Sequence, residues 1–283
     1  MTARILDGKA VAGEIFDEVS KLVGERVARG GSRPRLATIL VGDDPASVRY
    51  VELKQRNARS VGIESEDHRL QRATSTDELL ALVDRLNHDD TVSGVLVQQP
   101  TPKQIDMPRV VFALDPVKDV DGFHPVNAGL VALGLPGGVE PCTPAGVVEL
   151  LQRFGVQFEG ANAVVVGRSN LVGKPLALLM LKRNATVTLC HTRTRDLAAN
   201  TRRADILVAA AGRAGLIQKD MVKQGAAVVD VSTNWVDGRQ VGDLGPGVDE
   251  VAGWLTPNPG GIGPMTRAML IRNTYLAEAK RRP

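Results

Sequence analysis

Apolar residues recur along the first half of the chain in two periods, which predict helices and buried strands in alternation. The expected helices cover 9–28, 45–61 and 75–86, and the expected strands cover 35–42, 67–70 and 94–98. Pro45, in a turn after Asp44, and the cap residue Ser75 mark where two of these helices begin. Strands that alternate with helices are typical of a parallel sheet covered by helices.

The second half repeats this alternation after a connection rich in proline and glycine, LGLPGGVEPCTPAG. Helices are expected at 144–154 and 175–183, and strands at 163–167, 186–190, 204–210 and 226–231. A glycine-rich loop, Thr256 to Thr266, leads into a last helix from Pro264 to about Lys280. We therefore expect two α/β domains, hinged near Cys142 and again near Gly260.

Composition excludes several classes of function. The chain has 283 residues, of which 43% are hydrophobic and 24% charged, as in ordinary soluble globular proteins. Its net charge of +3 comes without a basic tract interleaved with aromatics, so no nucleic-acid partner is expected. The longest charge-free run, Gly122 to Val139, contains prolines and glycines, so no membrane helix is expected. Two distant cysteines indicate a reducing compartment, and four scattered histidines give no metal-ligand spacing.

The stretch VVVGRSNLVGKP, residues 164–175, is similar to two different phosphate-binding loops. A magnesium-nucleotide loop has four residues between its glycine and Gly-Lys, and then Ser or Thr. Here five residues separate Gly167 from Gly173, and Pro175 offers no hydroxyl, which excludes an ATP or GTP loop. In the dinucleotide pattern Gly167 is the first glycine, Ser169 replaces the second, and Gly173 comes one place late. The physical requirements of a dinucleotide turn are met, although spacing alone leaves an ordinary turn open.

The charges that follow this turn favour NADP over NAD. An NAD site usually has an acid about 20 residues after its glycines, where it accepts the ribose hydroxyls. No acid occurs between Glu159 and Asp196. Arg168 and Arg193, both at the ends of expected strands, would instead favour an extra phosphate on the adenine ribose. A solvated basic face is the alternative, and it suits the helical Lys182 better than these two arginines.

The candidates for chemistry lie in the first half. Tyr50 and Lys54 stand four residues apart on one face of a helix, and such a lysine can move protons in a cleft. A plain surface helix is the alternative there. Gln98 ends the strand GVLVQ, where ligands of α/β sheets bind, although Gln99 is equally polar. Asp121 could pair with a guanidine-like ring edge or could simply cap a turn.

A series of segments occurs in the order found in one known family. They are ILDGKAVA, VGDDPASVRYVELK, GVLVQQPTP, KDVDGFHPVNAG, PCTPAGVVELL, VVVGRSNLVGKP, ATVTLCH and PGGIGPMT. With them the chain resembles the bifunctional methylenetetrahydrofolate dehydrogenase/methenyltetrahydrofolate cyclohydrolase family over nearly its whole length. The resemblance implies two α/β domains with a cleft between them: a catalytic folate domain over 1–142, completed by the helix 264–283, and a Rossmann-type NADP-binding domain over 143–263. It also implies a cytoplasmic homodimer.

The activity implied by the resemblance is NADP-dependent oxidation of methylenetetrahydrofolate to methenyltetrahydrofolate, followed by hydrolysis to formyltetrahydrofolate. Lys54 would be the catalytic lysine of hydrolysis, Tyr50 would pack against the folate, Gln98 would tune Lys54, and Asp121 would anchor the pterin edge. Other folate contacts would come from Gly260, Gly261 and Pro264. The cofactor would bind against Gly167, Arg168, Ser169, Gly173, Thr192 and Arg193.

The sequence departs from this family's pattern at three places. Ser232-Thr233 stands where the family has Gly-Ile, which puts a side chain where glycine allows close approach of the nicotinamide. Residues 244–248 resemble an insertion, and Asn258 replaces an apolar loop residue. Two other functions remain as alternatives: a Rossmann dehydrogenase for an amino or hydroxy acid, and a folate- or nucleotide-binding module without catalysis. Lys54 together with Asp121 argues against the second.

Overall fold

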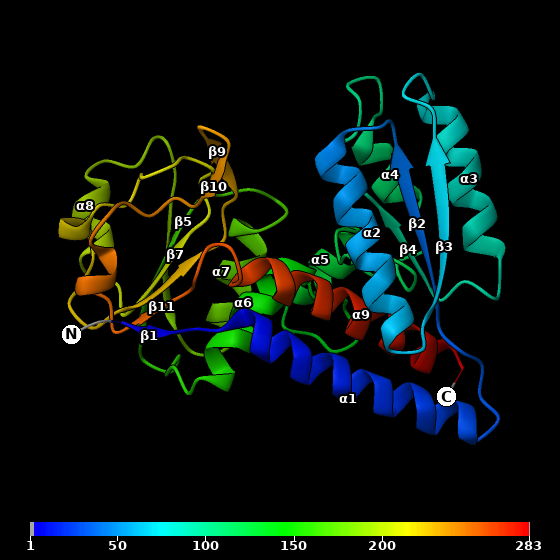
Figure 1. Cartoon of the computed structure of the whole chain (residues 1–283), viewed down its shortest axis with the longest axis horizontal. Helices are drawn as coiled ribbons and strands as arrows, with labels where there is room; N and C mark the ends of the chain where they lie inside the picture. The colour runs from blue at the N-terminus through cyan, green and yellow to red at the C-terminus, as the bar shows by residue number, and fades with distance from the viewer. Residues whose placement is uncertain (1–2, 283) are drawn as a thin grey trace. The chain divides into compact units, whose positions relative to one another are not determined.

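Two compact units make up the chain in the computed structural model, which describes residues 3–282. The six-stranded unit consists of Thr143–Thr266 and the described residues up to Ala12. The three-stranded unit consists of Gly13–Cys142 and the described residues from Arg267 onward. Each unit is built on a parallel sheet with helices around it (Figure 1). The predicted two-domain α/β fold is thereby confirmed.

The smaller sheet has β2 (Arg35–Val41) at its centre, between β3 (Glu64–Leu70) and β4 (Gly94–Val97), all parallel. The helices of this unit are α2 (Pro45–Ser60), α3 (Thr76–His88), α4 (Met107–Ala113), α5 (Pro125–Ala132), most of α1 (Gly8–Ala28) and most of α9 (Ile262–Arg281). Two helices begin where the sequence predicted, α2 at Pro45 and α3 after the cap residue Ser75. The Asp44 carboxylate accepts from Ser47 N at 2.8 Å before α2, and Ser75 and Glu78 form a capping box at α3.

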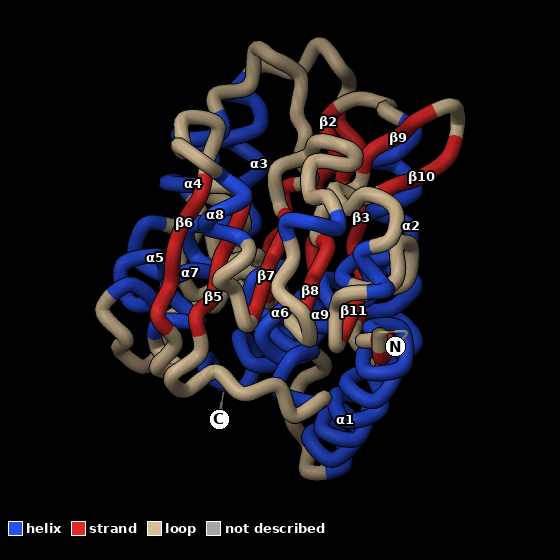
Figure 2. The backbone as a smooth tube through the Cα atoms, turned by 90° about the vertical axis from the view of Figure 1, so that its left-hand side faces the viewer, coloured by secondary structure: helices blue, strands red, loops and turns tan. Residues whose placement is uncertain are grey.

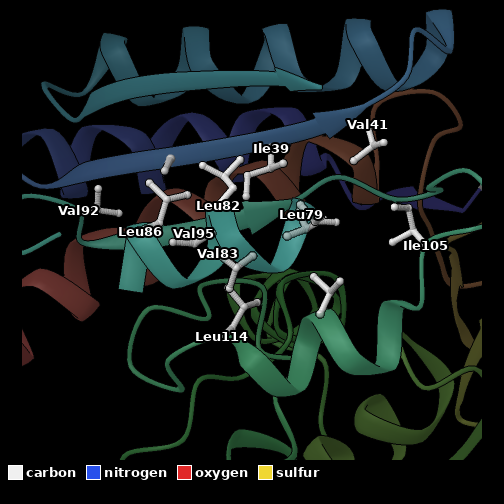
Figure 3. Packing of buried hydrophobic residues seen from close by; sticks show 13 residues of the cluster. Ile39, Val41, Leu79, Leu82, Val83, Leu86, Val92, Val95, Ile105 and Leu114 are labelled. Carbon is white, nitrogen blue, oxygen red and sulfur yellow. The ribbon is translucent and has the colours of Figure 1, made fainter. Parts of the chain in front are cut away.

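Alternation along β2 separates the two faces of this sheet. On one face, apolar side chains of β2, β4, α3 and α4 point toward one another and form a buried cluster (Figure 3). Burying each large member of such a cluster stabilises the fold by about 1.5–3 kcal/mol. On the opposite face the Thr38 hydroxyl accepts from Gln55 Nε2 at 2.9 Å, which fixes α2 over that face. The sheet therefore carries α2, with Tyr50 and Lys54, as a rigid element.

The larger sheet has the order β6 (Thr186–Cys190), β5 (Asn162–Val166), β7 (Ile206–Ala209), β8 (Ala227–Asp230), β11 (Trp254–Leu255), β1 (Arg4–Ile5), with every neighbouring pair parallel. Figure 2 shows the strands from β6 to β11 side by side. The helices of this unit are α6 (Cys142–Arg153), α7 (Gly173–Leu181) and α8 (Leu197–Thr201), with short 3₁₀ turns at Lys219–Met221 and Val248–Glu250. The chain passes from β5 to β6 on one side and then to β7 on the other. This reversal is a topological switch, and ligands of doubly wound sheets bind beyond the carboxyl ends of the strands there.

Several elements are additional to those expected from the sequence pattern. They are α4, α5 and α8, the two 3₁₀ turns, the two-residue strands β1 and β11, and the antiparallel hairpin of β9 (Asn234–Val236) and β10 (Arg239–Val241). The hairpin turns at Asp237-Gly238, where both residues have positive φ, +49° and +73°. An Asp-Gly pair between short strands is a strong hairpin signal, so this element could have been predicted from its turn.

The first described residues lie with the six-stranded unit because β1 pairs in parallel with β11, Arg4 opposite Trp254. The division predicted from the sequence instead groups residues 1–142, so the two divisions differ at the amino terminus. The two-residue strand β1 carries no periodic signal that could have revealed this pairing. None of the helices within residues 3–282 is long and apolar enough to span a bilayer.

Candidate active site

Lys54 is the buried end of a polar pair on α2. Its side chain is 5% exposed, and its Nζ donates to Gln98 Oε1 at 3.0 Å. Nζ also lies 5.7 Å from the ring centroid of Tyr50, one helical turn earlier, within the range of a cation–π interaction. Tyr50 itself is 37% exposed. A plain surface helix would leave Lys54 in solvent, so its burial against Gln98 distinguishes this lysine from that alternative, whereas Tyr50 remains exposed.

Gln98 follows β4 at the carboxyl end of the three-stranded sheet and is almost buried. Its amide is held at both ends, because Oε1 accepts from Lys54 and Nε2 donates to the carbonyl of Gln99. The orientation of the acceptor toward Lys54 is therefore set by the backbone of the next residue. Of the two adjacent glutamines, Gln98 is the one that contacts the lysine.

Asp121 belongs to a loop that a different carboxylate holds in place. The fully buried Asp119 accepts from Gly122 N at 3.1 Å, from His124 N at 2.7 Å and from Asn127 Nδ2 at 2.9 Å. Capping of this turn, which the sequence left open as a role for Asp121, thus falls to Asp119. Asp121 keeps some exposure to solvent, and its carboxylate interacts with the Cys142 thiol.

The electrostatics connect Asp121 with Lys54. Burial raises the pKa of the Asp121 carboxyl above its ordinary value, the positive charge of Lys54 lowers it in part, and Asp119 raises it again. The buried Cys142 thiol, whose pKa is raised well above its usual value by burial and by Asp121, donates to Val120 O at 3.2 Å. A cation, a carboxylate and an aromatic ring thus gather in this unit. They can hold a flat, hydrogen-bonding ring and manage a proton beside it.

Two residues of α9 support this cluster and were not predicted. Arg267 Nε donates to Asn57 Oδ1 at 3.0 Å; burial lowers the Arg267 pKa, and the neighbouring Tyr50 raises it. Asn273 Nδ2 donates to Val120 O at 3.0 Å and to Glu140 O at 3.1 Å, which fixes the chain next to Asp121. Both residues are far from the cluster in sequence and carry no motif, so no sequence signal pointed to them.

The glycine turn after β5 is packed so closely that only glycine fits. Gly167 has φ +134°, and a Cβ on it would lie 2.1 Å from Ala210 O in the segment after β7. A Cβ on Gly173, at the start of α7, would lie 2.0 Å from Gly167 O. The Ser169 hydroxyl accepts from Val172 N at 3.1 Å and from Gly173 N at 3.4 Å. The backbone of this turn and the amino end of α7 therefore lie close to the topological switch. Such an arrangement of backbone amides is suited to binding the phosphates of a dinucleotide.

Two arginines and a threonine that were expected at the cofactor follow the predicted strands. Arg168 follows β5, and Thr192 and Arg193 follow β6, so all three come from the same edge of two neighbouring parallel strands and are exposed. Within residues 3–282 neither arginine forms an ion pair. This surplus of positive charge suits a phosphorylated adenine ribose.

Gly260, Gly261 and Pro264 lie in the loop before α9 and in its first turn, in the six-stranded unit. Gly260 has φ +114°, and Gly261 N donates to Pro257 O at 2.8 Å. A Cβ on Gly8 would lie 1.8 Å from Gly261 O, so this loop packs closely on the start of α1. The unit that contains Lys54 does not contain these three residues.

Comparison with known proteins gives matches over almost the whole chain. Residues 6–121 match the family model of the tetrahydrofolate dehydrogenase/cyclohydrolase catalytic domain, and residues 141–282 match its NAD(P)-binding domain. A relative named bifunctional protein FolD, from Sorangium cellulosum, is 54% identical over 99% of both chains.

Solved structures of similar proteins agree. The bifunctional FolD methylenetetrahydrofolate dehydrogenase/cyclohydrolase of Campylobacter jejuni has a TM-score of 0.96 and 44% identity, covering 99% of each chain. The Trypanosoma brucei methylenetetrahydrofolate dehydrogenase-cyclohydrolase, complexed with NADP cofactor and inhibitor, has a TM-score of 0.94 and 37% identity, covering 99% of this chain and 98% of that one.

Proposed function

The chain belongs to the tetrahydrofolate dehydrogenase/cyclohydrolase family, and we propose that Lys54, Tyr50, Gln98 and Asp121 form its folate-converting site. It is a bifunctional enzyme that oxidises methylenetetrahydrofolate with NADP and hydrolyses methenyltetrahydrofolate. The alternative substrates, an amino or hydroxy acid, and the alternative of a non-catalytic binding module are thereby set aside. The observation that carries the site assignment is the buried Lys54–Gln98 hydrogen bond beside Tyr50 in the unit that matches the catalytic model.

The dehydrogenase step needs orientation more than acid–base catalysis. NADP supplies the hydride acceptor, and loss of a hydride from the methylene bridge leaves a methenyl cation on the folate. Asp121 holds the pterin edge through paired hydrogen bonds, and the exposed Tyr50 ring packs against the flat substrate. Gly167 and Gly173 shape the turn that receives the cofactor phosphates, with Arg168 and Arg193 beside it. The contribution of these residues is positioning, which can supply several kcal/mol of a barrier.

The hydrolysis step needs proton management, which Lys54 can supply. Water adds to the methenyl carbon, one carbon–nitrogen bond of the bridge breaks, and one proton is released as formyltetrahydrofolate forms. Lys54 Nζ carries the proton between the attacking water and the departing nitrogen, while Gln98 Oε1 fixes its position. Tyr50 limits where Nζ can move by covering it from one side.

The remaining assignments are also part of this proposal. Residues 1–142 with 264–283 form the functional folate domain, and 143–263 form the NADP domain. Gly260, Gly261 and Pro264, from the loop that joins these two ranges, contribute to folate binding. The enzyme acts as a homodimer in the cytoplasm, in one-carbon metabolism that supplies purine, histidine and methionine biosynthesis. Sedimentation of the purified protein tests the dimer directly, since a monomer at micromolar concentration would contradict it.

Arg193→Ala is expected to raise the KM for NADP by about tenfold or more, with a much smaller effect on the KM for NAD. The reason is that a charge-assisted hydrogen bond to a phosphate is worth about 1.5–3 kcal/mol, and only NADP carries that phosphate. Dehydrogenase rates with methylenetetrahydrofolate and each cofactor measure this difference. Arg203→Ala, an exposed arginine before the amino end of β7, is the matched control. Equal losses for both cofactors in the Arg193 variant would disprove the phosphate assignment.

Asp121→Asn is expected to raise the KM for the folate substrate by about 10–100-fold at neutral pH, because paired hydrogen bonds to a carboxylate are lost. In the wild type the KM should rise as pH falls through the pKa of Asp121, which burial raises above the usual carboxyl value. The asparagine side chain does not titrate in this range, so the KM of the variant should not rise as the pH falls. Asp77→Asn, an exposed carboxylate paired with Arg109, is the control. If the KM of the Asp121 variant rose at low pH as in the wild type, another group would be responsible for that rise.

A further inference from the structure

Ser232, which stands where the family has glycine, forms two hydrogen bonds through its hydroxyl. Its hydroxyl accepts from Gly212 N at 3.0 Å and donates to Asp243 Oδ2 at 2.7 Å. A glycine at this position would have no group to make either bond. The serine is therefore part of a hydrogen-bonded network and is more than an obstacle placed after β8.

Asp243, the acceptor of this bond, organises the segment that follows β7. Its side chain is fully buried and accepts from Ala211 N at 2.7 Å, Gly212 N at 3.1 Å and Arg213 N at 2.7 Å. Residues 211–213 are here called the amide loop. A buried carboxylate is stable only when such donors satisfy it. Ser232 and Asn234, whose Nδ2 donates at 3.0 Å, complete the set.

The amide loop lies where the cofactor is expected to bind. It follows β7, at the topological switch between β5 and β7. Ala210, immediately before it, is the residue whose carbonyl would collide with a Cβ on Gly167. The residue that precedes the amide loop is thus packed directly against the glycine turn.

Asn258, a second departure from the family pattern, binds the same segment from another side. Its Nδ2 donates to Ser232 O at 2.8 Å, and its Oδ1 accepts from Gln240 Nε2 at 2.8 Å. An apolar residue at position 258 could make neither bond. The two departures are therefore linked to each other through the backbone of Ser232.

We propose that Ser232, supported by Asn258, is a positioning residue for the NADP-dependent step. Its hydroxyl donates one of the hydrogen bonds that satisfy Asp243 and thereby holds the amide loop against the cofactor. This rests on the proposed function, in which NADP binds along the carboxyl edge of the six-stranded sheet. It also reverses the expectation from the sequence alone, under which the side chain at 232 would only obstruct the nicotinamide.

The two interpretations predict opposite results for Ser232→Gly. If the hydroxyl positions the amide loop, Ser232→Gly and Ser232→Ala should both raise the KM for NADP about tenfold, as expected for losing a hydrogen bond to a buried carboxylate. Ser232→Thr, which keeps the hydroxyl, should restore a KM close to that of the wild type. If the side chain only obstructs the cofactor, Ser232→Gly should lower the KM for NADP. That result, or an unchanged KM in Ser232→Ala, would overturn the proposal.

The controls separate positioning from a general loss of structure. Cyclohydrolase activity with methenyltetrahydrofolate supplied directly uses no oxidant, so it should be unchanged in the Ser232 variants. Thr201→Val removes a buried hydroxyl that donates to Ala198 O in α8, in the same unit, and should leave the KM for NADP unchanged.

The coupling between Asn258 and Ser232 has its own test. Asn258→Val should raise the KM for NADP, and when it is combined with Ser232→Ala the two effects should be less than multiplicative. Fully multiplicative effects would contradict the coupling. If the wild-type protein had neither activity, the proposed function itself would be contradicted.

Discussion

Lys54→Met is expected to reduce the cyclohydrolase rate by about 10²–10⁴-fold, the range over which a positioned acid–base group contributes to catalysis. Methionine is similar in length to the lysine stem and apolar, so it should fill the buried space without an ammonium group. The variant would lack the ammonium group that Gln98 Oε1 holds in place to carry the proton between water and the departing nitrogen. The rate of loss of methenyltetrahydrofolate, supplied directly, measures the effect.

The matched control for this variant is Arg56→Met, which removes an exposed cation from the same helix. It should retain the hydrolysis rate of the wild type. In the Lys54 variant, hydride transfer to NADP should persist at a reduced rate, because that step depends on orientation. Normal hydrolysis in Lys54→Met would remove the lysine from the mechanism.

Gly167→Ala should raise the KM for NADP by about a hundredfold, the size of effect that a displacement on the order of 1 Å can have at a reacting site. The added Cβ would sit 2.1 Å from Ala210 O, and the residue would have to keep φ +134°, which side chains rarely adopt. The turn must therefore move, together with α7 or the segment after β7. Dehydrogenase kinetics at varied NADP concentration measure the result.

Gly155→Ala provides the control for this change. Gly155 also has a positive φ, +71°, but a Cβ there would meet nothing within 4 Å. It should cost about 1 kcal/mol of stability from backbone strain and leave the KM for NADP unchanged. If Gly167→Ala behaved like Gly155→Ala, the close approach at the glycine turn would not matter for the cofactor.

Much of the fold could be predicted because its main helices and strands carry clear periods. The apolar stripe of α1 and the buried runs of β2 and β5 are examples, and the structure has each of them within a few residues of the expected bounds. Elements without a period were not predicted: β1 and β11 have two residues each, and they exist only because they pair with one another and with β8. Pairing of that kind depends on tertiary contacts, which no local pattern records.

The site was predictable where its residues share one element. Tyr50 and Lys54 are one helical turn apart, so their proximity follows from spacing. The choice of Gln98 over Gln99 depends on which amide faces Lys54, and the role of Asp119 in holding the Asp121 loop depends on long-range hydrogen bonds. The contribution of Ser232 could not be foreseen because its partners come from two other segments, at Gly212 and Asp243.

We propose that one chain oxidises methylenetetrahydrofolate and hydrolyses the product with Lys54. The most direct test follows NADPH and formyltetrahydrofolate together after purified protein receives methylenetetrahydrofolate and NADP. The wild type should form both in equal amounts, whereas Lys54→Met should form NADPH and accumulate methenyltetrahydrofolate. Absence of NADPH with the wild type, or formyltetrahydrofolate produced equally well by the Lys54 variant, would contradict the claim.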